Sequence, residues 1–197
     1  MNQRGIFNYS ARFCTCIDNF ISSSTADSML IGGKFIAPVR SSIVKIQKFD
    51  SGQYSIFEIS NWFLLKDRMT HAKLQKLCYY AQAWCFTLKG KRLADTDFQA
   101  WNQGPVSPAL YERFKGFGYR SIEIRTHHRP AIQEEDLEFL EDVWDTYGDK
   151  TGNALEALTH RELPWIEARR GYGVRENCMV VITPESMKRY YSSIYNR

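Results

Sequence analysis

The stretches KLQKLCYYAQAW at residues 73–84 and FQAWNQGPVSPALY at residues 98–111 decide the fold. The first places apolar side chains on two opposite sides of a helix, which we expect to run from the N-cap candidate Thr70 to Gly90. Neither side of such a helix can face water, so it belongs in the middle of a bundle. The second stretch changes period, with a short extended piece, a Gly-Pro turn and a Ser-Pro helix start. We therefore predict a mainly α fold, a compact helical domain around a central two-faced helix with a few short β-strands.

Amphipathic segments on both sides of this core predict further helices. In IFEISNWFLLK at residues 56–66, apolar residues recur at helical spacing after the N-cap candidate Ser55. Phe57 and Leu64 lie off that stripe, so we expect this helix to bury more than one side. EEDLEFLEDVWDTYG at residues 134–148 is the clearest singly amphipathic helix. Two extended pieces are predicted at 92–93 and 98–101, and we expect them to pair with each other. The other predicted elements are helices starting at Pro108, Gly152, Leu163 and Pro184, and a strand at 178–182.

Residues 1–53 differ in character from the rest of the chain. They contain a Ser-rich stretch at residues 22–25, a Gly32-Gly33 pair and no sustained helical or alternating period. We predict an irregular, poorly ordered N-terminal extension there and one compact domain over residues 54–197. The chain has 197 residues, of which 44% are hydrophobic, so such a domain can bury a sizeable core.

The charge distribution makes nucleic acid an unfavoured partner. The net charge of +4 divides into +3 over residues 1–50 and only +1 over residues 51–197, whereas phosphate binding needs a concentrated basic surface. No apolar run approaches the roughly 18 residues of a membrane span, and the N-terminus lacks the apolar region of a secretory signal. The five cysteines show no metal-ligand spacing, and Cys78 and Cys85 lie seven apart, as small apolar side chains on one helical face would. A cytoplasmic, reducing setting without membrane contact fits best.

No motif predicts catalysis. The histidines are His71, His127, His128 and His160, and they form no zinc-binding motif. His160 and Glu162 could supply a base and a carboxylate to a hydrolase, but close neighbours on a helix point in different directions. The simpler interpretation is that His160 ends a helix, where a cation is favourable. We predict that the chain is not an enzyme and has no catalytic residue, no cofactor and no metal site.

The acid-rich helix has two interpretations. Eight of the chain's 22 acidic residues lie here without an intervening Lys or Arg: Glu134, Glu135, Asp136, Glu138, Glu141, Asp142, Asp145 and Asp149. Such a run is usually a solvated face. The alternative is electrostatic steering of a basic protein partner, such as an RNA-targeting toxin.

Two tryptophans beside turns are candidates for partner contact. With five Trp, eleven Tyr and twelve Phe, most aromatic side chains must fill the core, and that interpretation is the commoner one for each. Trp and Tyr also dominate the energetics of protein interfaces. The predicted partner-binding residues lie around Trp101 and around Trp165: Trp101, Asn102, Gln103, Gly104, Pro105, His160 and Trp165.

The order of several short motifs resembles the Panacea domain, which is found in SocA-like antitoxins and phage-associated proteins. The matching residues are Lys73 to Leu77, Tyr79 to Trp84, Ala100-Trp101, Gly104-Pro105-Val106, Tyr111 with Phe114, Leu158-Thr159-His160, Pro164-Trp165, and Met187 with Tyr190-Tyr191. The resemblance covers residues 54–195. The chain departs from it at Gln103, where an aromatic usually precedes the Gly-Pro turn, and at Cys85, where a histidine often follows the Trp.

The resemblance implies a cytoplasmic antitoxin that binds a cognate protein toxin encoded next to it. The antitoxin then either neutralises the toxin directly or delivers it to a protease. A DNA-binding regulator of phage or mobile-element origin is the alternative, suggested by several short helices and the basic loop at residues 120–129.

Overall fold

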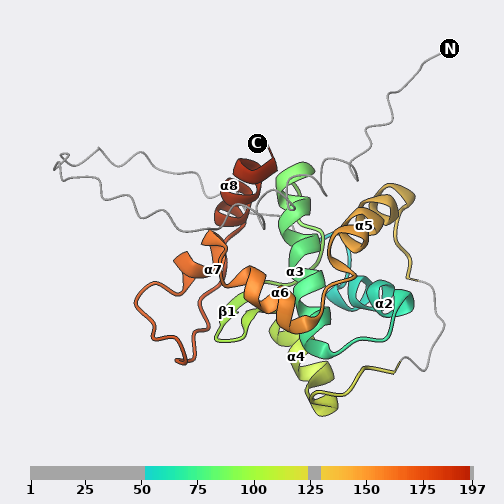
Figure 1. Ribbon diagram of the computed structural model, residues 1–197. Coiled ribbons are helices and arrows are strands. Elements are labelled where there is room, and N and C mark those ends of the chain that lie inside the picture. Colours follow the sequence, from blue (N-terminus) through green and yellow to red (C-terminus); the bar gives the residue numbers. More distant parts are fainter. Residues whose placement is uncertain (1–51, 124–129, 196–197) are drawn as a thin grey trace.

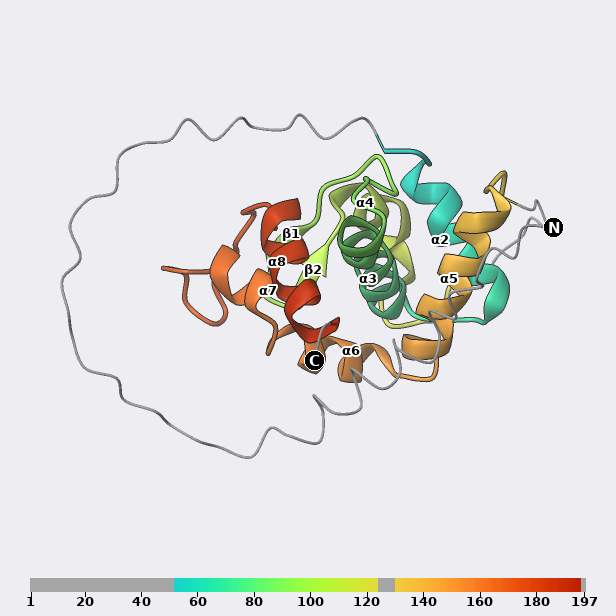
Figure 2. The ribbon, with the colours of Figure 1, turned by 90° about the horizontal axis from the view of Figure 1, so that it is seen from above.

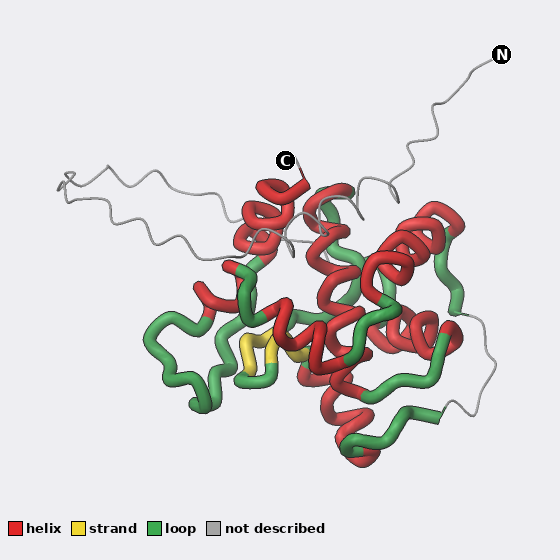
Figure 3. Tube along the Cα trace, in the orientation of Figure 1, coloured by secondary structure: helices red, strands yellow, loops and turns green. Residues whose placement is uncertain are grey.

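The computed structural model describes residues 52–123 and 130–195 (Figure 1), and every structural statement below concerns these residues. Most of the predicted N-terminal extension, His127, His128 and much of the basic loop at 120–129 lie outside them. The elements are α2 Ile56–Lys66, α3 His71–Leu88, β1 Gln99–Trp101, β2 Gly104–Val106, α4 Pro108–Phe114, the 3-10 turn η1 Lys115–Phe117, α5 Glu134–Tyr147, α6 Gly152–Thr159, α7 Leu163–Ala168 and α8 Pro184–Tyr195. The mainly α fold is confirmed, with β1 and β2 as a small hairpin among helices (Figure 3).

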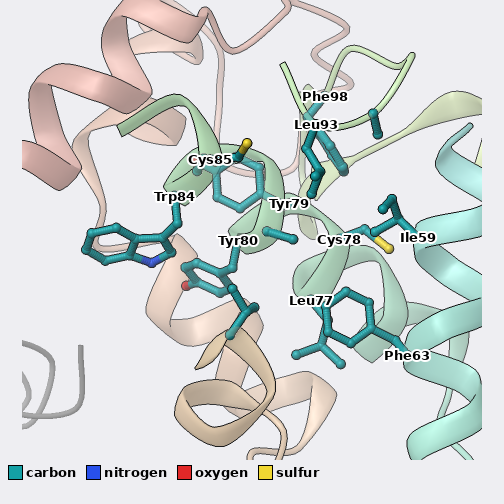
Figure 4. Close-up of a cluster of buried hydrophobic side chains, with 14 of the residues drawn as sticks. Ile59, Phe63, Leu77, Cys78, Tyr79, Tyr80, Trp84, Cys85, Leu93 and Phe98 are labelled. Atoms are coloured by element: carbon teal, nitrogen blue, oxygen red, sulfur yellow. The ribbon is translucent and has the colours of Figure 1, made fainter. Parts of the chain in front are cut away.

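Helix α3 lies at the centre of the fold, as predicted. Seen from above, α2 and α5 lie on one side of it and α7 and α8 on the other (Figure 2). Leu77 and Cys78 project toward α2, while Tyr80 and Trp84 project from another side of the helix (Figure 4). These four side chains are at most 1% exposed. Truncating one of them to Ala removes a large buried side chain, and for Trp84 that costs on the order of 3–5 kcal/mol.

The predicted N-caps hold the helix starts. The hydroxyl of Ser55 caps α2, and the carboxylate of Glu58 accepts from the Ser55 N–H at 3.0 Å, which completes a capping box. The hydroxyls of Thr70, Ser107 and Thr183 accept backbone N–H groups at the starts of α3, α4 and α8. Gly90 follows α3 with a positive φ of 66°, which suits a residue without a side chain just past a helix end.

The strand pairing differs from the sequence prediction. β1 pairs antiparallel with β2, with Trp101 opposite Gly104, so Asn102 and Gln103 form the turn and Gly104-Pro105 begins β2. Residues 92–93 pair with residues 53–54 instead of 98–101, since Tyr54 N–H donates to the Leu93 carbonyl at 2.9 Å. Of the predicted strand at 178–182, a short extended piece remains, and Val181 bridges Gln99 on the outer side of β1.

Three side-chain placements also bear on the sequence predictions. Of the two residues that lie off the apolar stripe of α2, Leu64 is buried as predicted, whereas Phe57 is 37% exposed. Asp136, assigned to the solvated acidic face, is 1% exposed, because Tyr54 Oη and Lys89 Nζ bind its carboxylate at 2.8 and 2.7 Å. Cys78 and Cys85 are buried as predicted, and burial raises the pKa of both thiols.

The helices and the potential metal ligands of the described residues bear on function. None of their helices is long and apolar enough to cross a membrane. Their His, Cys, Asp and Glu side chains form no group of three or more that could hold a metal ion.

Candidate functional site

The fold brings the two halves of the predicted partner-binding site together. The indole Nε1 of Trp165 on α7 donates to the carbonyl oxygen of Trp101 in β1 at 2.9 Å. The ring of His160, at the end of α6, stacks on the Trp165 indole with centroids 4.1 Å apart. We call Trp101, Asn102, Gln103, Gly104, Pro105, His160 and Trp165 the hairpin site. Its residues are neighbours in space, and their binding to a partner remains a prediction.

The hairpin site has an exposed tip and a half-buried aromatic base. Asn102 and Gln103 are exposed, whereas Gly104 and Pro105 are buried. Trp101 is half-buried, packs edge-on against Tyr111 at 4.9 Å, and donates its indole N–H to the Gln99 side chain. Trp101 and Trp165 therefore each have a structural contact and still offer part of a ring to solvent.

Gly104 is required by its backbone and by its surroundings. Its φ is +96°, a conformation that residues with side chains rarely adopt. A Cβ there would lie 2.6 Å from Cε of Lys76 and 2.9 Å from Oγ1 of Thr159. The turn of the hairpin therefore rests directly on side chains of α3 and α6.

Lys76 is an unusual residue to find beneath a turn. It is 2% exposed, and no hydrogen bond or ion pair joins its Nζ to another of the described residues. Burial lowers the pKa of Lys76 to about 8, although Glu156 acts in the opposite direction. A buried cation without a carboxylate partner is energetically costly, so burial favours the neutral form of the Lys76 side chain.

Two histidines lie in the same environment. Burial lowers the pKa of His71 and of His160, and the charge of Lys76 lowers both further. His71 Nδ1 and His160 Nε2 are buried and have no hydrogen-bond partner among the described residues. His160 does cap the end of α6, as predicted, but its lowered pKa means that it is not the favourable cation assumed there.

Glu162 does not form a catalytic pair with His160. Its carboxyl group accepts hydrogen bonds from Tyr191 Oη at 2.7 Å and Tyr80 Oη at 3.2 Å, which join α8 and α3. Burial raises the pKa of Glu162 to about 8, and the two tyrosine bonds act in the opposite direction. Glu162 is 3% exposed and serves the core. In the sequence, the features that could have indicated this structural role of Glu162 are the tyrosine pairs Tyr79-Tyr80 in α3 and Tyr190-Tyr191 in α8.

The strands and helices that form the hairpin site lie almost entirely within the part of the chain that matches a known family. Residues 74–166 match the family model described as "Antitoxin SocA-like, Panacea domain". Over these residues the chain is similar to the SocA-like Panacea domain. A curated relative, Antitoxin SocA of Caulobacter vibrioides (strain NA1000 / CB15N), is 29% identical over 117 aligned residues, and the match covers 53% of this chain. The match spans 62% of that relative's length. No solved structure matches the chain.

The end of the Panacea match coincides with a concentration of exposed apolar side chains. Most of the large exposed apolar residues among those described lie between residues 163 and 181: Leu163, Ile166, Tyr172, Val174, Met179, Val180 and Val181. We call residues 163–181 the apolar segment. It comprises α7 and the loop that projects from the side of the molecule opposite α2 and α5 (Figure 1). Of this segment, only Trp165 is among the partner-binding residues predicted from the sequence, because the loop has no regular apolar period.

One arginine fixes the shape of this loop beside the β1–β2 hairpin. Arg169 is 6% exposed, and its Nη1 donates to the carbonyl oxygen of Ala100 in β1 at 2.8 Å. Its Nη2 donates to the carbonyl oxygens of Gly173 and Glu176, both at 2.8 Å. The loop is therefore attached to the hairpin through a buried guanidinium and presents its apolar side chains in a defined arrangement.

The acidic face belongs to α5, which lies on the side of α3 opposite α7 and α8 (Figure 2). Glu134, Glu138 and Asp145 are exposed. Burial, followed by the charges of Asp145, Glu138 and Glu141, raises the pKa of Asp142 to about 6. The face therefore gains negative charge as the pH rises through about 6. Steering of a basic partner by this face remains a prediction.

Proposed function

We propose that the chain is an antitoxin that binds a cognate protein toxin and blocks it, acting by binding and not by catalysis. The match to the SocA-like Panacea domain and the similarity to a curated antitoxin support this role. The observation that carries the binding mode is the apolar segment, because large exposed apolar side chains concentrated in one segment of a folded protein suggest a protein-binding surface.

The proposed binding surface joins the apolar segment to the hairpin site. Trp165 belongs to both and is half-buried against His160 and Trp101, so it can act as a rigid aromatic anchor. Leu163 and Ile166 extend this surface along α7 with exposed fractions of 48% and 43%. Burial of such side chains against a toxin is worth roughly 25 cal/mol per Å² of apolar area, less the cost of association.

Toxicity rescue tests the proposal. The product of the adjacent gene is expressed alone and together with this chain, and cell growth is followed. We expect growth arrest in the first case and rescue in the second. If the adjacent product is not toxic, or if this chain does not restore growth, the antitoxin role is wrong. Toxin levels separate the two modes, since direct neutralisation leaves the toxin intact and delivery to a protease depletes it.

A matched pair of variants tests the surface. Leu163→Glu places a charge on the apolar segment, and Leu65→Glu places the same charge on α2, where Leu65 is similarly exposed at 41%. We expect Leu163→Glu to abolish rescue and Leu65→Glu to retain it at equal protein levels. Equal rescue by both variants would remove the apolar segment from the proposed interface and leave the antitoxin role standing.

A further inference from the structure

The hairpin has a third extended partner on its outer side. Ala100 N–H donates to the carbonyl oxygen of Val180 at 2.9 Å, and Ile182 N–H donates to the carbonyl oxygen of Phe98 at 2.8 Å. Between these two bonds, Val181 lies opposite Gln99 in an antiparallel bridge. Residues 180–182 thus form the outer edge of a small sheet whose middle strand is β1.

The outer edge of this strand is open. Hydrogen-bonding groups of successive residues in a strand point to opposite sides, so the N–H and C=O of Val181 point away from β1. No backbone hydrogen bond joins either group to another of the described residues. Residues 179–181 also lack the proline and charged side chains with which proteins usually protect a strand edge.

The side chains around this edge favour an extended apolar partner. Met179 is 69% exposed, Val180 40% and Val181 39%. The edge is already held in its extended shape, because Arg169 ties the preceding loop to the carbonyl of Ala100. A pre-ordered edge loses little conformational freedom when another strand pairs with it.

The charges beside the edge indicate the chemistry of that partner. Arg170 and Arg175 are exposed in the adjoining loop and form no ion pair with another of the described residues. The carboxylate of Glu176 is occupied, since it accepts the Gly173 N–H at 2.8 Å. Glu176 is also exposed, so Arg170, Arg175 and Glu176 together have a formal net charge of +1, which complements carboxylates.

We propose that the toxin adds an extended segment to the Met179–Val181 edge as a further β-strand, with apolar side chains flanked by Asp or Glu. In this mode the main-chain hydrogen bonds supply affinity and the alternating side chains supply specificity. The inference rests on the proposed antitoxin function and specifies how its surface works. The edge lies beyond residues 74–166, so the family match does not include it.

A pair of substitutions at Val181 tests the strand addition. Val181→Pro removes the outward N–H and leaves both hydrogen bonds to β1 in place, because those bonds use Val180, Phe98, Ala100 and Ile182. Val181→Thr keeps the N–H and a β-branched side chain. With the purified product of the adjacent gene, we expect Val181→Pro to weaken binding by at least about tenfold and Val181→Thr by less than about threefold. Equal melting temperatures establish that both variants are folded.

Hydrogen exchange gives a measurement that needs no substitution. The Val181 amide should exchange rapidly in the free chain and slowly in the complex with the adjacent gene product. Binding without this protection, or undiminished binding by Val181→Pro, would overturn the proposal while the antitoxin role stands. A dimer of the free chain in which the Val181 amide is already protected would also overturn it, since a second copy would then occupy the edge. Failure of growth rescue concerns the antitoxin role instead.

Discussion

Trp165 Nε1 and the carbonyl oxygen of Trp101 are joined by a 2.9 Å hydrogen bond that spans 64 residues of sequence. The bond connects α7 to β1 and fixes the angle at which the apolar segment leaves the hairpin. It also explains why two motifs that are distant in the chain form one site. A neutral hydrogen bond of this kind contributes about 1 kcal/mol to stability.

Replacing Trp165 by Phe removes the indole N–H and keeps an aromatic ring to stack on His160. We expect the free energy of unfolding to fall by about 1–2 kcal/mol, measured by urea denaturation. Trp144→Phe is the control, because Trp144 is also half-buried and its indole N–H makes no hydrogen bond to another described residue. An equal loss in both variants would mean that ring size, and not the bond to Trp101, sets the cost.

Gly104→Ala combines backbone strain with steric overlap. At φ +96° the new Cβ would meet Lys76 Cε at 2.6 Å, so we expect a loss of at least about 2 kcal/mol in thermal or urea unfolding. Gly90→Ala is the matched control, since Gly90 has φ +66° just past the end of α3 and nothing within 4 Å of its Cβ position. It should lose only about 1 kcal/mol, from backbone conformation alone. Similar losses would show that Lys76 moves aside easily.

Glu162 makes stability depend on pH. Its pKa is raised from 4.5 to about 8 by burial, so the folded state holds a proton that the unfolded state releases between these values. This contribution to stability is fully present below pH 4.5, declines as the pH rises, and is lost above about pH 8. Glu162→Gln has no such proton and can still bond to Tyr80 and Tyr191. The stability of the wild type relative to this variant should therefore fall between pH 5 and pH 8 in urea titrations. A constant difference across that window would contradict the raised pKa.

Lys76→Met replaces a buried ammonium with an apolar side chain of similar length. Because the ammonium has no partner among the described residues, we expect Met to leave stability unchanged or to raise it by on the order of 1 kcal/mol at pH 7. Because burial lowers the pKa of Lys76 to about 8, the free energy of unfolding of the wild type should rise relative to that of the variant as the pH rises from 8 toward 10.5. A strong loss of stability in Lys76→Met at pH 7 would show that the ammonium makes favourable polar contacts.

The helices and their caps followed from local patterns in the sequence. Ser55, Thr70, Ser107 and Thr183 precede amphipathic segments, and an N-cap is decided by residues within one turn of it. The two-faced composition of α3 was likewise sufficient to place it at the centre. These predictions needed no knowledge of distant contacts.

Most of the errors concern partners that are distant in the chain. Asp136 resembles its acidic neighbours, and only Tyr54 and Lys89 make it a buried residue. Residues 92–93 pair with the start of the described chain because that segment lies beside them in space. At the candidate site, the residues of the hairpin and of α7 were predicted, whereas the apolar loop was missed. Its shape depends on Arg169 and on bonds to β1, which leave no period in the sequence.

Arg169 has one further consequence. Every group that it binds in the loop is a backbone carbonyl, which any amino acid supplies. The path of the loop is therefore largely independent of which side chains it carries. Substitutions at exposed positions such as Val174 can change the side chains that the loop presents without refolding it, so one backbone path can carry different surfaces.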